Sequence, residues 1–356
     1  MKGLRKYLAP FMPDISGAAA ALYDMGAIIV ISDAGGCTGN VCGFDEPRWF
    51  RGKSAIFSAG LRDMDAIFGR DDKFIDKLAC AADKIKANFV AVIGTPVSTV
   101  IATDYRAIAK QAEARTGLPV IAVETTGTEL YDIGIVKAQA ALFERFTKGE
   151  AAAEPFIGVL GALPQDTAAF SSPYEITEQL TERYGLPARL YGPAEIENAK
   201  AAKLNIAVSP AGAATASLLA KIFGTPWKSC YPLRAFDAKA FATAHRGKRL
   251  LIIHQQVLAC SIRNELRKTT LFPQISCASC FMEEPYITEQ GDVALINEEE
   301  LARLTEKENY NLIMADPLFK KAMPKLSCEF LPLPHFAVSG SLYAKEKEAD
   351  FWGGLL

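Results

Sequence analysis

Short apolar segments alternate with amphipathic segments along most of the chain. Several of the apolar segments, such as Phe89–Gly94, are hydrophobic throughout, which is typical of strands covered on both faces. The predicted strands are Ala27–Ser32, Ala55–Ser58, Phe89–Gly94, Val120–Glu124, Phe156–Leu160, Ala188–Tyr191, Asn205–Ser209, Arg249–His254, Gln274–Cys277 and Leu312–Ala315. The predicted helices include Lys73–Lys86, Asp104–Thr116, Glu175–Tyr184 and Ala211–Phe223. This alternation predicts an α/β protein with parallel sheets.

Two polar stretches, at residues 148–155 and 244–249, each come directly before a predicted strand. They predict three Rossmann-like, doubly wound units, over residues 1–150, 151–245 and 246–356, the last with a C-terminal tail. Ligands of such folds bind beyond the carboxyl ends of the strands, so the residues that follow each strand are the candidates for chemistry.

Composition and charge limit the partners and the location that the sequence supports. The 356 residues are 50% hydrophobic and 22% charged, with a net charge of −2, which gives no reason to expect nucleic acid or an anionic membrane as partner. The longest apolar run, Gly26–Ile31, is far shorter than the ~20 residues of a membrane span. No secretion signal is visible, so we predict a cytoplasmic protein.

The chain contains eight cysteines. A protein of this size with large apolar cores does not need disulfides, so we expect reduced thiols that are either buried or ligands for metal. Cys80, Cys230 and Cys260 are assigned to core packing.

A glycine-rich segment, Ser32–Pro47, follows the first strand and contains Cys37 and Cys42. Its glycines, Gly36 among them, allow the backbone to turn sharply beside a bulky group. Thiolates bind iron and zinc, so the two cysteines are candidate metal ligands. The alternative is a glycine-rich turn with two incidental cysteines, because this spacing is no strong metal signature.

Cys277 and Cys280 form a Cys-x-x-Cys motif just after a predicted strand. Such a motif is a redox dithiol, half of a metal site, or two thiols in an ordinary turn. Of the three histidines, His254 lies where a strand is expected to end and His335 lies in the segment Pro332–Tyr343. Both are candidates for a catalytic site, although a lone histidine is more often a core residue. His245 lies in the basic stretch and is interpreted as solvated.

Several segments, in order and spacing, resemble the nitrogenase component 1 family over roughly residues 16–343. The segment Gly-Gly-Cys-Thr-Gly-Asn at residues 35–40 is similar to the family loop that carries a cluster cysteine. The further segments are Phe57–Lys77, Val92–Asp104, Pro119–Gly127, Lys203–Pro210 with Gly224–Trp227, and Gly247–Ile253.

The resemblance implies an iron–sulfur oxidoreductase subunit, but with a changed ligand set. Only Cys37 falls on a family cysteine position, because Thr95 replaces a second one and no cysteine precedes Cys37. Cys42 is additional. Two chains that each give Cys37 and Cys42 would supply the four thiolates of a [4Fe–4S] cluster. This hypothesis predicts a homodimer, and a related partner subunit is the other option.

The resemblance also implies a substrate site between the units. Ser209 stands where true nitrogenases have a cofactor cysteine, which argues against the molybdenum–iron cofactor. A different metal centre, a tetrapyrrole or an organic substrate could occupy the cleft, with His335 facing it as the family histidine does. Because the chain has no Gly-x4-Gly-Lys-Ser/Thr loop, ATP hydrolysis would belong to a separate iron protein that supplies electrons.

Two other functions stay open. A metallocluster assembly scaffold or carrier would share the fold and would transfer a cluster once, whereas a reductase turns over with ATP and electrons. A periplasmic-type binding protein without metal is the third, and the missing secretion signal and the Cys37 segment count against it.

Overall fold

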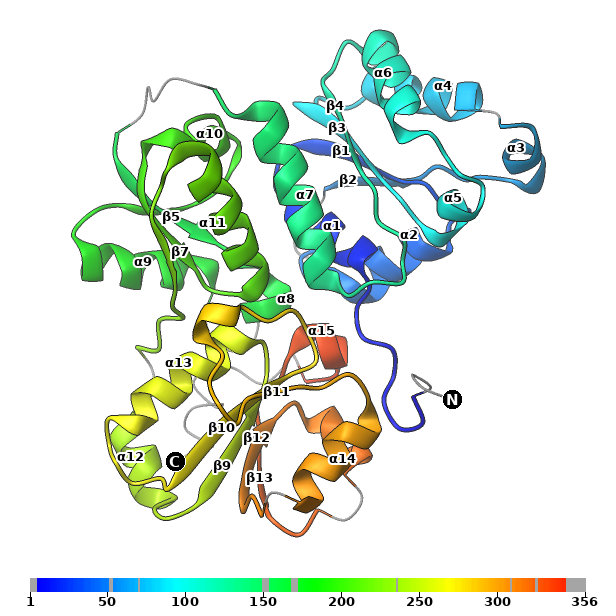
Figure 1. Ribbon diagram of the computed structural model, residues 1–356. Helices are drawn as coiled ribbons and strands as arrows, with labels where there is room; N and C mark the ends of the chain where they lie inside the picture. Colours follow the sequence, from blue (N-terminus) through cyan, green and yellow to red (C-terminus); the bar gives the residue numbers. More distant parts are fainter. Residues whose placement is uncertain are drawn as a thin grey trace. The chain divides into compact units, whose positions relative to one another are not determined.

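The computed structural model describes residues 5–50, 54–69, 71–148, 154–167, 172–234, 236–307, 309–323 and 326–343. The chain forms three sheets of parallel strands with helices packed beside them (Figure 1). The predicted fold class is therefore confirmed. Contacts divide the chain into two compact units: the one-sheet unit, with residues 12–151 and 192–199, and the two-sheet unit, with residues 1–11, 152–191 and 200–356.

The one-sheet unit contains a four-stranded sheet in the order β2-β1-β3-β4, all parallel. Its strands are β1 (Ala27–Ile31), β2 (Ala55–Ser58), β3 (Phe89–Ile93) and β4 (Val120–Val123). Its helices are α1 (Asp14–Leu22), α2 (Gly36–Asn40), the π-helical turn η1 (Val41–Asp45), α3 (Asp63–Phe68), α4 (Asp71–Ala82), α5 (Pro96–Val100), α6 (Tyr105–Thr116), α7 (Tyr131–Phe146) and α10 (Pro193–Glu197).

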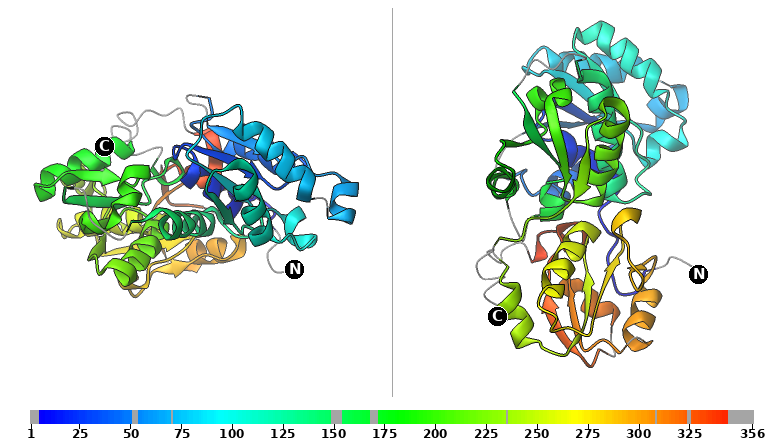
Figure 2. Two further views of the ribbon diagram at one scale, coloured as in Figure 1. Left: turned by 90° about the horizontal axis from the view of Figure 1, so that it is seen from above. Right: turned by 60° about the vertical axis from the view of Figure 1, so that its left-hand side comes forward.

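The two-sheet unit contains parallel sheets in the orders β6-β5-β7-β8 and β11-β10-β9-β12-β13 (Figure 2). The strands are β5 (Phe156–Leu160), β6 (Ala188–Leu190), β7 (Ala202–Ala207), β8 (Trp227–Ser229), β9 (Arg249–Ile253), β10 (Gln274–Ser279), β11 (Val293–Ala294), β12 (Leu312–Ala315) and β13 (Glu329–Pro332). The helices are α8 (Pro164–Thr167), α9 (Pro173–Tyr184), α11 (Pro210–Phe223), α12 (Ala238–Ala244), α13 (Gln256–Arg267), α14 (Glu298–Lys307) and α15 (Phe336–Ser339), with short 3-10 turns at Ala199–Ala201, Pro285–Ile287, Pro317–Ala322 and Gly340–Leu342.

The last two sheets share one hydrophobic core. Buried side chains of β5 and β7, such as Val159 and Ile206, belong to the same cluster as Leu250, Ile252 and Met314 of β9 and β12. Each sheet falls within one of the three predicted domains, but the shared core joins two of them. The three-domain division itself stays a prediction, and residues 149–153 of its first boundary lie outside the described part of the chain.

Strands that are apolar throughout were predicted most accurately, because burial on both faces leaves a continuous apolar run. β1, β3 and β5 are buried at every position. The short edge strands β8 and β11 were missed, since an edge strand of two or three residues carries too little pattern. β10 extends two residues beyond its predicted end at Cys277, and β7 ends at Ala207, two residues before Ser209.

Helices α1 and α7 cross at glycines, and they lie side by side in the one-sheet unit (Figure 1). A Cβ atom on Gly134 would lie 1.8 Å from the carbonyl oxygen of Asp14, and one on Gly17 would lie 1.8 Å from that of Tyr131. The crossing is fixed further by Asp14, whose carboxylate accepts the N–H groups of Thr126 and Gly127. Only glycine permits this approach of two backbones.

Among the residues that the structure describes, no helix has both the length and the apolar composition that crossing a bilayer requires.

The glycine crossing predicts that Gly134→Ala destabilises the fold. The new methyl group would clash with backbone atoms that cannot move aside without distorting the helices. We therefore expect a loss of roughly 2 kcal/mol or more in the free energy of unfolding, measured in urea. Gly39→Ala is the matched control, because a Cβ there has no neighbour within 4 Å. Equal stability of the two variants would contradict this account of the crossing.

Candidate functional site

The order of strands reverses once in each sheet, and the predicted site residues follow the strands at these points. The reversals lie between β1 and β3, between β5 and β7, and between β9 and β12. Cys37 follows β1, Ser209 follows β7 and His254 follows β9. A parallel sheet opens a crevice outside its carboxyl edge at such a point, because neighbouring connections leave toward opposite faces.

Asp33 organises the first of these points. It is 1% exposed and comes just after β1. Its carboxylate accepts the backbone N–H of Thr38 at 2.8 Å, the Thr38 hydroxyl at 3.0 Å and the Ser58 hydroxyl at 2.6 Å. These bonds tie the ends of β1 and β2 to helix α2, which carries Cys37. Asp33 is a positioning residue that sequence reasoning did not single out, although its place directly after a buried strand was a signal.

Cys37 and Cys42 do not lie in an open glycine-rich loop, as the sequence had suggested. Cys37 is in α2, and the chain continues without a break into the π-helical turn η1, which contains Cys42. The glycines act at the start of this segment: Gly35 has φ +122°, and Gly36 begins the helix. Such π-helical turns are rare and are frequently found at functional sites.

Both thiols of this pair are half-buried. Burial raises the pKa of Cys37, and the nearby negative charge of Asp33 adds to this effect. Burial likewise raises the pKa of Cys42, with Glu46 and Asp33 adding to it. Without metal, both groups therefore hold their protons at neutral pH. Binding iron as thiolates would release those protons, so affinity for the metal should rise with pH.

Thr95, which stands where the family has a second cysteine, has a structural role in this chain. Thr95 is fully buried and caps helix α5, with its hydroxyl donating to the carbonyl oxygen of Ser32 at 2.7 Å. The threonine therefore joins β3 to β1, and its side chain is committed to that role.

The chain by itself offers only part of a cluster site. Within the described ranges, no three histidine, cysteine, aspartate or glutamate side chains gather to hold a metal ion. Two half-buried thiols fit half of the four-thiolate set that a [4Fe–4S] cluster requires. The donor set is thus suited to a cluster shared with another chain.

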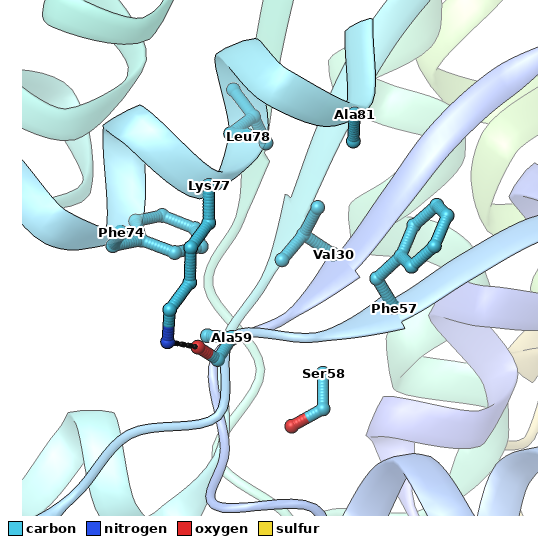
Figure 3. A pocket seen from close by; sticks show the side chains of 8 residues that line it. All are labelled: Val30, Phe57, Ser58, Ala59, Phe74, Lys77, Leu78 and Ala81. Atoms are coloured by element: carbon cyan, nitrogen blue, oxygen red, sulfur yellow. Dashed lines mark hydrogen bonds between the residues drawn. The ribbon is translucent and has the colours of Figure 1, made fainter. Parts of the chain in front are cut away.

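A small pocket opens between α4 and the ends of β1 and β2 (Figure 3). It holds about 90 Å³ and is lined mainly by apolar side chains, among them Val30, Phe57 and Leu78. Lys77 extends along its mouth and donates to the carbonyl oxygen of Ala59 at 3.0 Å. This volume is well below the ~300 Å³ at which ligand pockets begin, so the pocket is no substrate site for a bulky molecule.

The two-sheet unit brings the two predicted catalytic histidines together. His254 and His335 are each 2% exposed, and their rings stack with centroids 4.2 Å apart and an interplanar angle of 22°. Phe281 contacts His335 edge-on at 4.9 Å, and His254 Nε2 lies 3.2 Å from the carbonyl oxygen of Pro334. Two residues 81 positions apart in the sequence thus stack on each other, a contact that the sequence alone did not predict.

Two buried carboxylates complete this histidine site, and sequence reasoning missed both. Asp166 of α8 has Oδ1 3.8 Å from His335 Nε2. Asp316 accepts the backbone N–H of His335 at 2.8 Å and the Ser339 hydroxyl at 2.7 Å, which fixes the start of α15. Their positions in the sequence could have identified them, since Asp316 directly follows β12 and Asp166 lies shortly after β5.

Both histidines are neutral in the folded protein. Burial lowers the pKa of His335 to about 3. Burial also lowers the pKa of His254 well below its ordinary value, and the proximity of His335 adds to the effect because two stacked imidazolium ions would repel each other. Each ring therefore presents one N–H donor and one nitrogen acceptor, as a proton-transfer group requires.

Ser209 serves as the N-cap of α11. It is fully buried, and its hydroxyl accepts the backbone N–H of Gly212 at 3.3 Å. Gly161 lies so close that a Cβ there would be 2.1 Å from Ser209 Oγ. This packing accounts for a small serine at the position, whereas its predicted part in cofactor binding stays a prediction.

The Cys-x-x-Cys motif does not sit in one turn after a strand. Cys277 lies inside β10 and is 2% exposed in the shared core, whereas Cys280 follows the strand. Alternation along a strand directs residues three apart toward opposite faces. Burial raises the pKa of Cys280 to about 12, so this thiol is protonated. A role for either residue in cofactor binding remains untested.

Two minor assignments were wrong, and those of Cys260 and of Cys230, which packs against the core, were right. Cys80 is exposed on α4 although a buried position was expected, and His245 is 7% exposed, with Nδ1 3.4 Å from Glu329, although it was interpreted as solvated. Cys260 is buried in the core as predicted. The buried face of α4 carries Phe74, Ile75 and Leu78, and Cys80 lies off that face.

Comparison with known proteins defines the class of protein to which this chain belongs. A family model, nitrogenase component 1 type oxidoreductase, matches residues 14–240. The chain therefore belongs to this family. The match includes Cys37, Cys42, Asp166 and Ser209, and the predicted resemblance is confirmed.

Individual relatives are distant. The chain is 32% identical over 124 residues to the Ni-sirohydrochlorin a,c-diamide reductive cyclase complex, component CfbD, of Methanothermobacter thermautotrophicus, and the alignment covers 32% of this chain and 32% of that protein. The matched part thus spans about a third of the curated relative. A structure of nitrogenase Cp1 at pH 6.5 superposes with a TM-score of 0.72 and 12% identity, covering 98% of this chain and 90% of that chain. A second, at pH 5, gives 0.68 and 16%, covering 100% and 88%. At these identities the structures establish the fold alone.

The buried neutral histidine predicts instability in acid. In the unfolded chain His335 takes up a proton below pH ~6.5, but in the folded protein only near pH 3, so stability is present above pH 6.5 and declines toward pH 3. Between pH 7 and pH 5, wild type should lose roughly 2 kcal/mol more unfolding free energy than His335→Gln. Urea unfolding at both pH values measures this, and identical losses would contradict burial of a neutral His335.

Proposed function

We propose that this protein is an iron–sulfur oxidoreductase component that accepts electrons from an ATP-hydrolysing iron protein and reduces a substrate at the histidine site. The observation that carries the proposal is the placement of Cys37 and Cys42. In a chain of the nitrogenase component 1 type, they lie half-buried on consecutive helical turns beside the first strand-order reversal.

The cluster is proposed to be a [4Fe–4S] cluster shared between two chains. One chain offers two thiols at this position, and no third ligand joins them among the described residues. Cys37 and Cys42 from a second copy, or cysteines of a related partner subunit, would complete four thiolates. Such a cluster supplies one-electron transfer when it is bound. Asp33 holds α2 and thus Cys37 in place, and it gives this half-site a fixed geometry.

Several large apolar side chains of the one-sheet unit are exposed, one of them within this segment, and they support a subunit contact there. Phe44, in η1 next to Cys42, is 70% exposed. Phe50 is 81% exposed, and Val100 of α5, at the carboxyl edge of the same sheet, is 84% exposed. Large apolar side chains gathered on one part of a surface are typical of protein contacts, because water leaves them when a partner binds.

The proposed substrate class is a tetrapyrrole. The curated relative is a component of a reductive cyclase complex for Ni-sirohydrochlorin a,c-diamide, and Ser209 offers no thiolate to a metal cofactor of the nitrogenase kind. His335 and His254 would act on the substrate as neutral imidazoles. Asp166, 3.8 Å from His335 Nε2, would relay a new proton to His335 after that ring has given its own proton to the substrate.

Iron content tests the cluster. Protein purified without oxygen should contain about four iron and four sulfide per two chains and give an EPR signal on reduction. Cys37→Ala and Cys42→Ala should each lose most of the iron, because each removes two of four ligands from a symmetric site. Cys80→Ala, which removes an exposed thiol of α4, is the matched control and should keep it. Unchanged iron in Cys37→Ala would remove this site.

Turnover tests the histidine site. With the iron protein, ATP, dithionite and a nickel tetrapyrrole, His335→Ala should lower kcat by about 100-fold or more while it leaves the EPR signal of the cluster intact. His245→Ala, at a histidine of the same unit that bonds Glu329, should keep wild-type rates. Normal turnover by His335→Ala would refute the role of His335. A single stoichiometric transfer of iron, without ATP consumption, would instead identify an assembly scaffold.

A further inference from the structure

Cys260 and Cys277 lie side by side in the core of the two-sheet unit. Cys260 belongs to α13 and is 3% exposed, and Cys277 belongs to β10 and is 2% exposed. Both are members of the core shared by the two sheets, and the two thiols are within hydrogen-bonding range of each other. This pair is therefore built by tertiary packing and is independent of the Cys-x-x-Cys spacing.

A buried guanidinium contacts the pair. Arg263, one turn after Cys260 on α13, is 1% exposed, and its Nη2 lies 3.3 Å from Cys260 Sγ. Its Nη1 binds both carboxylate oxygens of Asp292, at 2.6 and 2.7 Å. Asp292 also accepts the backbone N–H of Cys277 at 3.0 Å. The charge of Arg263 is thus balanced, and its position against Cys260 is fixed from two sides.

The two thiols differ in their readiness to ionise. The hydrogen bond from Cys277 lowers the pKa of Cys260, and the Arg263 guanidinium lowers it further against the opposing effect of burial. Burial raises the pKa of Cys277 well above its ordinary value, and this thiol keeps its proton. Of the two, Cys260 is the thiol that ionises more readily, and Cys277 is placed to donate its S–H to the resulting thiolate.

We propose that Cys260 and Cys277 form a redox-active dithiol, poised by Arg263, that hydroperoxides oxidise to a disulfide. In the first step the Cys260 thiolate attacks one peroxide oxygen: an S–O bond forms, the O–O bond breaks, and the leaving hydroxide or alkoxide takes a proton. In the second step Cys277 attacks Cys260 Sγ, and water leaves with the Cys277 proton. Two thiols and one peroxide thus give one disulfide, one water and one alcohol or a second water.

This assignment separates Cys277 from its neighbour in the sequence. Cys280 follows the end of β10, and strand alternation directs it away from the core face that Cys277 occupies. Within the described part of the chain, the Arg263 guanidinium contacts Cys260, Ile287, Asp292 and Glu289 and does not contact Cys280. The partner of Cys277 is therefore set by the packing of α13 on β10.

Peroxide titration tests the dithiol. Protein purified without oxygen is treated with a few equivalents of hydrogen peroxide, quenched with catalase, alkylated in denaturant and digested for mass spectrometry. A peptide pair joined through Cys260 and Cys277 should appear before any other disulfide. In Cys277→Ser, Cys260 should stop as a sulfenic acid that dimedone traps. Neither measurement depends on a cluster or on turnover, so failure of the proposed function leaves the test intact.

Charge variants test the role of Arg263. Arg263→Gln should slow formation of this disulfide by about tenfold or more, because the thiolate loses its counter-charge. Arg263→Lys keeps the charge and should oxidise faster than Arg263→Gln. Arg267→Gln is the matched control, since Arg267 bonds Glu289 on the same helix without touching a thiol, and it should oxidise at the wild-type rate.

Three results would overturn the proposal. They are a disulfide of Cys277 with Cys280, persistence of both core thiols after the exposed thiols have been oxidised, and equal rates for wild type and Arg263→Gln.

Discussion

The carboxyl edges of parallel sheets, at the points where strand order reverses, decide where this protein can do chemistry. A strand buried on both faces must end in a connection, and at a reversal the two neighbouring connections leave toward opposite faces. Polar groups placed there keep their hydrogen bonds while apolar strands fill the core behind them. Asp33 after β1, His254 after β9 and Asp316 after β12 all occupy such places. The core of each sheet thus determines the position of its reactive side chains.

The same constraint gives the two candidate sites opposite characters. In the one-sheet unit, Asp33 accepts a hydrogen bond from Thr38 of α2. The thiols of Cys37 and Cys42 are half-buried, so that ligands from another chain can reach them. In the two-sheet unit, His254 and His335 are buried away from water. This burial lowers the pKa of both rings and holds them neutral. Two half-buried thiols suit a shared cluster, and a buried pair of imidazoles suits controlled proton transfer.

The cysteines show when closeness in sequence predicts closeness in the structure. Cys37 and Cys42 are close in sequence and stay on one continuous helical segment, so local spacing predicts their proximity. Cys277 and Cys280 are closer still in sequence, but strand alternation directs their side chains apart, and Cys277 instead meets Cys260. Whether two nearby cysteines form a unit depends on the periodicity of the element that carries them, and periodicity at an element's end is the least certain feature of a sequence.

The sequence by itself determined the α/β class, the buried strands and the family, because burial acts locally and leaves a readable pattern. Only the tertiary structure decided that His254 stacks on His335, that Asp166 and Asp316 join them, and that Arg263 faces Cys260. These contacts join residues from separate strands and helices, and no local pattern encodes which strand ends become neighbours. Sheet order fixes that choice, through packing distributed over the whole core.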